Sequence, residues 1–394
     1  MANKNLTDAK LAKNDEFYTQ YNDIQKEIEA YLEFDVNAFR NKTVYCNCDD
    51  PYESNFFRYF VLNFQKLGLK QLITTSYKPS PIANTQMELF GDDKSIKKVK
   101  GRPKITANRF IINDVQDIDG DGEFNLQDVA LQLKKNKKNE WTPLDGDGDF
   151  RSNECIDLLK QSDIVVTNPP FSLFREYVKQ LFDYEKSFVI IGSMNAITYK
   201  EIFPLIKENK MWLGNGFHAG NAYFYTPNSR EFATGVFDAT TGLVKFRNVC
   251  WFTNLDHGRR HQPLPLMTMS DNFKYSKHKE IKGKKKYYEY VNYKAIEVPF
   301  TDAIPSDYSG VMGVPISFLD KYSPEQFEIL GTSDNGIIDD IYKKTPGLSK
   351  QFVDDYYKAG GTGTYKEGNP TAGYYDNDIA TMAYKRIFIR HKGK

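Results

Sequence analysis

Hydrophobic and polar positions change their period repeatedly along the first 255 residues. Helical spacing of apolar residues alternates with short β-branched and aromatic runs, and Gly68 follows one helical pattern where a helix would end. Strands are predicted at 42–48, 70–77, 163–168, 186–193 and 242–255, and helices at 23–32, at 55–69 and directly after residue 171. Strands and helices that alternate at such short intervals predict an α/β fold built on a parallel sheet.

Two segments depart from this alternation. Residues 79–110 lack periodicity and are rich in proline, lysine and polar residues, which indicates a surface insertion. From about residue 256 the pattern changes to short segments with many tyrosines and lysines. We therefore expect one domain over residues 1–255, with the insertion at about 79–110, and a second region over residues 256–394.

Charge, cysteine content and the lack of long apolar runs indicate which compartments and partners the chain fits. The 394 residues are 27% charged with a net charge of +1, so attraction to a polyanion would come from local basic clusters. The four cysteines are too few and too scattered for a disulfide scaffold, which favours a reducing, cytoplasmic location. No run of eighteen apolar residues occurs, so we expect neither export nor a membrane partner.

The candidate chemistry lies at the end of the strand "DIVVTN", whose last residue, Asn168, is followed directly by Pro169, Pro170 and Phe171. Ligands of open α/β sheets bind beyond the carboxyl ends of the strands. Two prolines carry no N–H, which leaves the carbonyl of Pro169 as an acceptor beside the amide oxygen of Asn168. Two acceptors next to an aromatic ring can hold the amino group of a flat nucleobase. The alternative is a turn that only ends the strand and starts a helix.

The tetrapeptide resembles the Asp/Asn/Ser-Pro-Pro-Tyr/Phe motif of amino-methyltransferases that act on DNA. Together with "NDEFYTQYNDIQKEI", "YCNCDDPYESNFFRYFVLNF" and "LDGDGDFRSNE", it is similar to the EcoRI-type adenine-specific DNA methyltransferases. The resemblance implies a Rossmann-like class I methyltransferase sheet with helices on both faces, followed by an α+β target-recognition region. It also implies methyl transfer from S-adenosylmethionine to the 6-amino group of an adenine flipped out of double-stranded DNA, with Asn168, Pro169, Pro170 and Phe171 as the catalytic turn.

The resemblance also supplies candidate cofactor contacts. They comprise an N-terminal pair near the methionine part, a loop after the first strand and a pair at the adenine ring: Tyr18, Thr19, Asp49, Asp50, Pro51, Ser54, Asp149 and Phe150. Two departures from the family pattern are present. Ser54 and Phe56 stand where glycines normally occur in the loop, and Ser76 and Tyr77 stand where an acidic residue normally binds the ribose.

Other motifs suggest additional ligands. "DIDGDGEFNLQD" places Asp117, Asp119, Asp121 and Asp128 at calcium-loop spacing, although a plain acidic turn is the alternative. "QMELF" (86–90) resembles a peptide that docks into a replication sliding clamp. These patterns make calcium and a replication sliding clamp candidate further ligands of the chain.

Basic residues give the candidate DNA contacts. They lie in an AT-hook-like "GRP", in "DHGRRHQPL" and in a lysine and tyrosine-rich stretch: Arg102, Lys104, Arg259, Arg260, Lys284, Lys285 and Lys286. Solvated basic surface is the alternative for each cluster. We expect a monomer that works with a cognate restriction endonuclease or as an orphan methylase. Two other functions stay open at this point, namely methylation of RNA or of a protein glutamine amide, and a DNA-binding module without catalysis.

Overall fold

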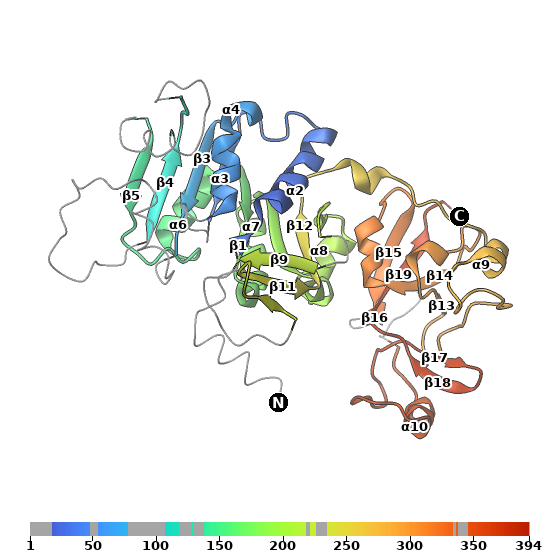
Figure 1. Ribbon diagram of the computed structural model, residues 1–394. Helices are drawn as coiled ribbons and strands as arrows, with labels where there is room; N and C mark the ends of the chain where they lie inside the picture. Colours follow the sequence, from blue (N-terminus) through green and yellow to red (C-terminus); the bar gives the residue numbers. More distant parts are fainter. Residues whose placement is uncertain are drawn as a thin grey trace. The chain divides into compact units, whose positions relative to one another are not determined.

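The structure is a computed structural model that describes residues 18–47, 54–77, 107–117, 128, 138–217, 221–225, 235–333, 336–337 and 346–393. The chain forms two compact units (Figure 1). Unit 1 comprises Met1–Met194 and Leu213–His257, and unit 2 comprises Asn195–Trp212 and Gly258–Lys394. Chain connections therefore pass between the units three times.

An eight-stranded mixed sheet organises unit 1. Its order is β5 (Glu140–Pro143), β4 (Asn108–Ile112), β3 (Gln71–Thr75), β2 (Thr43–Cys46), β6 (Ile164–Thr167), β7 (Ser187–Ser193), β12 (Val249–Thr253) and β8 (Trp212–Leu213). The central strands β3, β2, β6 and β7 pair in parallel, and β4, β5 and β12 pair antiparallel with their neighbours. The predicted α/β class and its parallel strands are confirmed.

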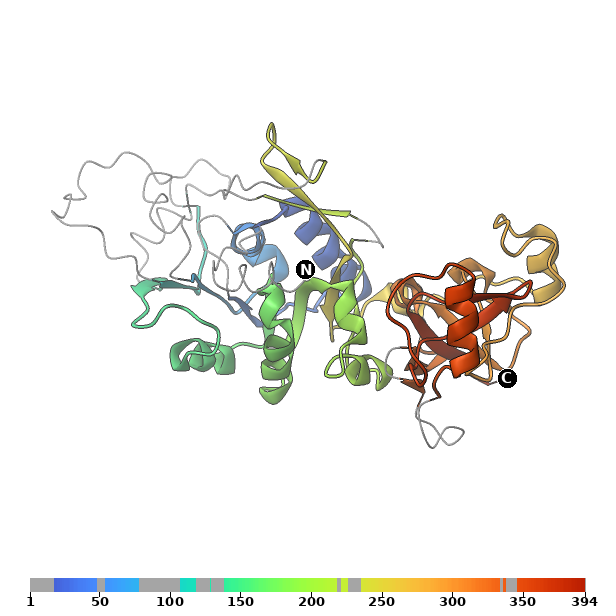
Figure 2. The same cartoon turned by 90° about the horizontal axis from the view of Figure 1, so that it is seen from below.

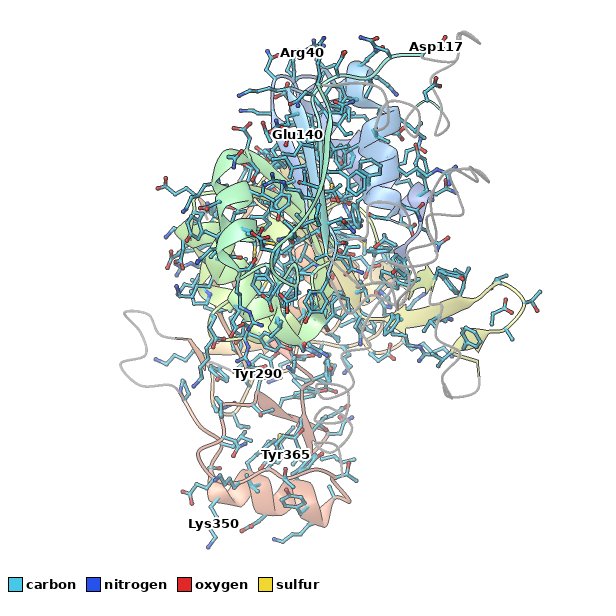
Figure 3. All side chains as sticks on the ribbon, turned by 90° about the vertical axis from the view of Figure 1, so that its left-hand side faces the viewer. Arg40, Asp117, Glu140, Tyr290, Lys350 and Tyr365 are labelled. Carbon is cyan, nitrogen blue, oxygen red and sulfur yellow. The ribbon has the colours of Figure 1, made fainter. Side chains whose placement is uncertain are left out.

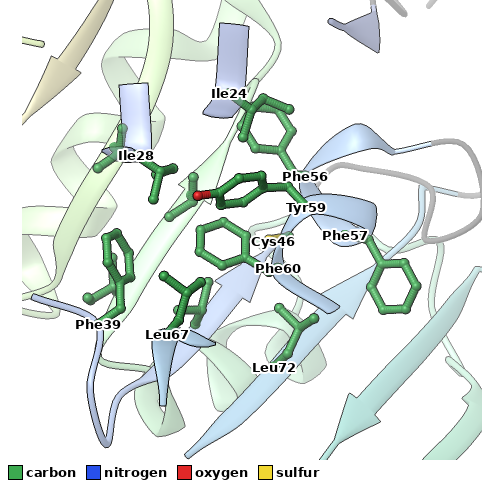
Figure 4. Close-up of a cluster of buried hydrophobic side chains, with 14 of the residues drawn as sticks. Ile24, Ile28, Phe39, Cys46, Phe56, Phe57, Tyr59, Phe60, Leu67 and Leu72 are labelled. Carbon is green, nitrogen blue, oxygen red and sulfur yellow. The ribbon is translucent and has the colours of Figure 1, made fainter. Parts of the chain in front are cut away.

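The helices of unit 1 cover both faces of this sheet (Figure 2). They are α2 (Tyr21–Phe34), α3 (Asn55–Leu62), α4 (Phe64–Leu67), α6 (Asn153–Gln161) and α7 (Phe174–Asp183). Helices α2 and α3, in blue, lie on one face, and α6 and α7, in green, lie on the other. The apolar residues predicted from helical spacing point to the sheet, where Ile24 and Ile28 of α2 pack with Phe56 and Phe60 of α3 (Figure 4). Gly68 ends α4 with a left-handed φ of 63°, as its position in the sequence predicted.

A smaller antiparallel sheet also belongs to unit 1. Its order is β1 (Tyr18–Thr19), β9 (Asn221–Tyr225), β11 (Leu243–Arg247) and β10 (Phe237–Asp238). The single β-rich run predicted over 242–255 is in fact two strands, β11 and β12, in different sheets. The chain changes direction between them at Asn248, whose φ is 59°.

Unit 2 is a second α+β assembly. Its five-stranded sheet has the order β13 (Ala295–Glu297), β14 (Val311–Pro315), β19 (Arg386–His391), β15 (Phe327–Thr332) and β16 (Gly336–Ile337), and β17 (Gly373–Asp376) pairs with β18 (Ile379–Met382). Its helices are α8 (Phe203–Lys207), α9 (Met269–Tyr275) and α10 (Lys350–Lys358). A buried ion pair of Glu297 and Arg386 lies in its core, with Tyr290 donating to the same carboxylate.

Short 3-10 helices cover Phe171–Leu173, Met194–Thr198, Gly258–His261, Thr301–Ala303 and Ile316–Lys321. Across the described part of the chain, none of the helices combines the length and the apolar character that a membrane crossing requires.

Candidate active site

The predicted catalytic turn starts immediately after β6. Asn168 and Phe171 are partly exposed, whereas Pro169 between them is buried. The carbonyl of Pro170 accepts a hydrogen bond from the backbone N–H of Leu173 at 2.9 Å, which closes the first turn of the 3-10 helix. The carbonyl of Pro169 accepts no hydrogen bond within the described residues. The turn therefore offers a backbone acceptor next to the Asn168 amide and the Phe171 ring.

Packing of α7 against the sheet fixes the position of this turn. Phe174, the first residue of α7, is buried, and its ring centroid lies 5.0 Å from that of Phe252 on β12. A Cβ at Gly192 of β7 would stand 2.5 Å from the Phe174 ring, so only glycine admits the ring at this point. The helix start, and with it the proline turn, is held close to the sheet surface.

A set of buried hydrogen bonds connects the turn to the end of β2. The Thr167 hydroxyl donates to the backbone carbonyl of Asn47, and the Tyr177 hydroxyl of α7 donates to Oδ1 of Asn47 at 2.7 Å. We call Asn47, Thr167 and Tyr177 the Asn47 bridge. Since all three side chains are buried, each of these hydrogen bonds is shielded from water. The bridge was not identified from the sequence. The one local signal for it is the position of Asn47 directly after the strand β2.

The Asp149 and Phe150 pair lies beyond the carboxyl end of β3. Gly148, with φ of 78°, brings this segment so close that a Cβ there would stand 2.0 Å from the carbonyl oxygen of Ser76. The buried Phe150 ring meets the Tyr177 ring edge-on, with centroids 4.9 Å apart. The structure thus places the pair next to the Asn47 bridge.

The Asp149 carboxylate is engaged by its neighbour Arg151. Nε and Nη2 of Arg151 donate to its two oxygens at 2.9 and 2.7 Å, and Nη1 lies 3.1 Å from Glu176. These hydrogen bonds raise the pKa of Arg151 further, so the guanidinium is a permanent cation. The arginine therefore fixes the direction of the Asp149 carboxylate.

Tyr18 and Thr19 form the edge strand β1 and approach α3. Nδ2 of Asn55, the first residue of α3, donates to the Thr19 carbonyl at 2.8 Å. Thr19 is 3% exposed, and its Oγ1 has no hydrogen-bond partner within the part of the chain that the structure describes. A buried hydroxyl in this state fits a polar ligand group, because burial without a partner costs free energy.

Other predicted cofactor residues are placed differently. Ser54 is buried and caps α3, because its Oγ accepts from the backbone N–H groups of Phe56 and Phe57 at 3.1 and 3.3 Å. Asp49, Asp50 and Pro51 lie outside the described residues.

A buried carboxylate on α2 holds a loop that the sequence did not single out. Glu27 accepts from the backbone N–H groups of Asn215 and Gly216 at 2.9 and 2.6 Å and from the Tyr31 hydroxyl at 2.6 Å. Burial, followed by the nearby charge of Glu27, raises the pKa of Tyr31 well above 10. Phe217, the last described residue of this loop, stacks on Trp251 with a ring separation of 5.5 Å. The carboxylate thereby ties the N-terminal helix to the segment that precedes β9.

The described candidates for DNA contact are all in unit 2, and they differ in exposure. Arg260 is buried, with its guanidinium 3.6 Å from the Trp212 ring and a hydrogen bond to Asn209, which is a packing role. Arg259 lies 4.0 Å from Asp320. Lys284 lies over the ring of Tyr288, and Lys285 and Lys286 are exposed. Arg102, Lys104 and the clamp-like peptide at 86–90 lie outside the described residues.

The predicted calcium loop is described only at its two ends. Asp117 is exposed at the periphery of unit 1 (Figure 3), and Asp128 is buried. Asp119 and Asp121 lie outside the described residues. Within the described ranges, no group of three or more histidine, cysteine, aspartate or glutamate side chains is arranged to hold a metal ion.

Comparison with known proteins gives three consistent similarities. Residues 5–392 match the family described as adenine-specific methyltransferase EcoRI. The Type II methyltransferase M.EcoRI of Escherichia coli is 44% identical over 333 residues, which is 83% of this chain and 89% of that protein. The Type II methyltransferase M.MpnI of Mycoplasma pneumoniae is 36% identical over 329 residues, 82% of this chain and 83% of that protein. No solved structure matches the chain significantly.

Proposed function

The chain belongs to the EcoRI family of adenine-specific methyltransferases, and we propose how its candidate site methylates DNA. The enzyme is a DNA adenine methyltransferase of the restriction-modification type that uses S-adenosylmethionine. The residue assignment is supported by the turn after β6, in which the Pro169 carbonyl accepts no hydrogen bond within the described residues and the partly exposed Asn168 and Phe171 flank the two prolines. These three groups match the needs of one flat base with an exocyclic amino group.

Asn168 and Pro169 hold the 6-amino group of the flipped adenine. Each accepts one of its two hydrogens, and Phe171 stacks on the ring. An adenine amine is a weak nucleophile because its lone pair is delocalised into the ring. Two acceptors outside the ring plane favour a more tetrahedral nitrogen, whose lone pair is available for in-line attack. Orientation and preorganised acceptors therefore supply most of the rate. As the new N–C bond forms, S-adenosylhomocysteine would leave with the electron pair of the broken S–C bond, and the methylated amine would release its extra proton to solvent.

The cofactor supplies an electrophilic methyl group on a sulfonium. On our proposal Tyr18 and Thr19 contact its methionine part, with Asp49, Asp50, Pro51 and Ser54 in the neighbouring loop, and Asp149 and Phe150 contact its adenine. The orphan hydroxyl of Thr19 and the Arg151-oriented carboxylate of Asp149 support this assignment. The order of strands β3, β2, β6 and β7 supports a Rossmann-like class I methyltransferase sheet within residues 1–255.

DNA contacts outside the pocket are proposed for the region 256–394, as the target-recognition part. The exposed Lys285 and Lys286, with Lys284, are the best placed of the predicted basic residues. Base extrusion costs a few kcal/mol, and contacts to the phosphates offset it. A monomer, a cytoplasmic location, a cognate restriction endonuclease, a sliding clamp and calcium at the acidic loop stay predictions.

Replacement of Asn168 tests the assignment. Asn168→Ala removes one of the two amine acceptors, and loss of one preorganised transition-state hydrogen bond costs about 100-fold or more in kcat. Asn168→Asp keeps an acceptor and should retain more activity than Asn168→Ala. The matched control is Asn153→Ala, an exposed asparagine in the first turn of α6.

Tritiated methyl transfer from S-adenosylmethionine is measured into duplex DNA, RNA and protein, together with cofactor affinity. We expect label in duplex DNA alone, with cofactor affinity within about twofold of wild type for both Asn168 variants. Full activity of Asn168→Ala would refute the pocket. Tritium label in RNA or in a protein amide would refute the assignment of duplex DNA as the substrate.

A further inference from the structure

The small sheet of unit 1 has two chemically different faces. Directly opposed residues of an antiparallel pair lie on the same face, and successive residues alternate. Thr19 of β1 opposes Phe224 of β9, which opposes Val244 of β11, and all three are buried. The other face begins with Tyr18, which opposes Tyr225, and continues with Tyr223, Leu243, Lys245 and Arg247. We call Tyr223, Tyr225, Lys245 and Arg247 the tyrosine face.

The tyrosine face exposes large aromatic surface. Tyr223 is 44% exposed and Tyr225 is 43% exposed, although both are large rings on a short strand. Nζ of Lys245 lies 5.9 Å from the ring centroid of Tyr223, and Arg247 is exposed. Aromatic rings interleaved with cations are the composition of surfaces that stack on unpaired bases and contact phosphates.

Among the described residues of the small sheet, one acidic side chain lies on this face. Asp238 of β10 opposes Leu243 and is the acidic residue nearest to the tyrosine face in the register of the sheet. Its carboxylate accepts from the Thr240 backbone N–H and the Thr241 hydroxyl, both at 2.9 Å, so it stabilises the turn between β10 and β11. Lys245 and Arg247 outnumber this single carboxylate, so the described part of the tyrosine face carries a net positive charge.

The position of the tyrosine face points to DNA as that ligand. Tyr225 pairs with Tyr18, and the two rings are 6.4 Å apart. Tyr223 lies two residues from Tyr225 on the same strand, about 7 Å along it, so both rings lie near the edge strand that we assign to the methionine part, the reactive end, of the cofactor. Methyl transfer brings the target adenine to this end, and the nucleotides next to it must lie nearby.

We propose that the tyrosine face binds DNA nucleotides unstacked by extrusion of the target adenine, with Tyr223 and Tyr225 as stacking surfaces and Lys245 and Arg247 as phosphate contacts. The proposal rests on the proposed function, since it takes its ligand from the same reaction. It assigns a DNA contact to unit 1 itself, in addition to the basic residues of unit 2.

The test compares DNA affinity of the full-length protein and the double variant Tyr223→Ala/Tyr225→Ala, in the presence of S-adenosylhomocysteine. The probes are a duplex with the recognition site and the same duplex with a mismatch at the target adenine. Stacking on an aromatic side chain contributes about 1–3 kcal/mol per base, so the double variant should bind the mismatched duplex at least tenfold more weakly. Tyr223→Phe/Tyr225→Phe keeps both rings and should bind within about twofold of wild type. Lys245→Gln should reduce the slope of the logarithm of the binding constant against the logarithm of salt concentration by about 1, which corresponds to one counterion.

Phe34→Ala is the matched control. Phe34 is 47% exposed at the far end of α2 and outside the site, so its loss should leave DNA affinity unchanged. Cofactor affinity and melting temperature show whether the double alanine variant is folded. Unchanged DNA affinity of a folded double variant overturns the proposal, as does an equal loss for Phe34→Ala. Failure of wild-type protein to methylate any duplex would instead refute the proposed function.

Discussion

Removal of the Tyr177 hydroxyl group should break the Asn47 bridge and leave the packing around it unchanged. Tyr177→Phe keeps the ring that packs edge-on against Phe150 and deletes only the donor that lies 2.7 Å from Oδ1 of Asn47. Both residues are buried, with exposures of 1% for Tyr177 and 3% for Asn47, so water does not readily replace the lost donor. A buried polar group left unsatisfied costs about 1–3 kcal/mol.

This cost has two measurable consequences. For a unit of this size, about 2–4 °C in melting temperature is expected per kcal/mol, so the variant should melt roughly 2–12 °C below wild type. Asn47 directly precedes the loop assigned to the cofactor, and a misplaced loop should raise KM for S-adenosylmethionine. A loss of 1.4 kcal/mol in cofactor binding free energy would raise this KM about tenfold.

The assay is steady-state methyl transfer at varied S-adenosylmethionine with saturating duplex DNA, alongside thermal unfolding. Tyr184→Phe, at the C-terminal end of the same helix, is the control, and it should behave as wild type. A Tyr177→Phe enzyme with the wild-type melting temperature and the wild-type KM would refute a positioning role for the bridge.

Further predictions concern Glu27 and its neighbours. Glu27→Ala leaves the N–H groups of Asn215 and Gly216 and the Tyr31 hydroxyl without their acceptor, so the free energy of unfolding should fall by about 3 kcal/mol or more. The exposed Glu33→Ala on the same helix is the control, and equal urea midpoints for the two variants would contradict this role. The raised pKa of Tyr31 means that the unfolded chain loses this proton first, near pH 10, so stability should be full below pH 10 and fall as the pH rises above it. Urea midpoints between pH 8 and 11 should fall less steeply in Tyr31→Phe, and an identical slope would exclude the contribution of Tyr31.

Local sequence was sufficient for the elements that carry the chemistry. The alternation of period predicted the parallel strands, and two prolines after a buried strand predicted the turn that the structure places at the end of β6. These features depend on residues that are neighbours along the chain, where propensity and periodicity act directly.

Features that depend on distant contacts could not be predicted. The split of residues 242–255 into two strands depends on which sheet each strand joins, and Asn248 gives only a weak local signal. The Asn47 bridge joins residues that are 120 and 130 positions apart. Arg260 looked like a phosphate contact because it is basic, and its burial against Trp212 depends on a segment 48 positions earlier in the sequence.

The passage of the chain between the units has a practical consequence for dissection of the enzyme. Residues 195–212 belong to unit 2, although they lie in the sequence between two parts of unit 1. Phe203 and Ile206 of α8 in this segment are buried, and α8 packs on β15 of unit 2. A fragment that stops near residue 257 would carry an orphaned helix whose apolar side invites aggregation, and a fragment that starts at residue 258 would lack it. Recombinant fragments should therefore replace 195–212 with a short polar linker in one half and graft that segment onto the other.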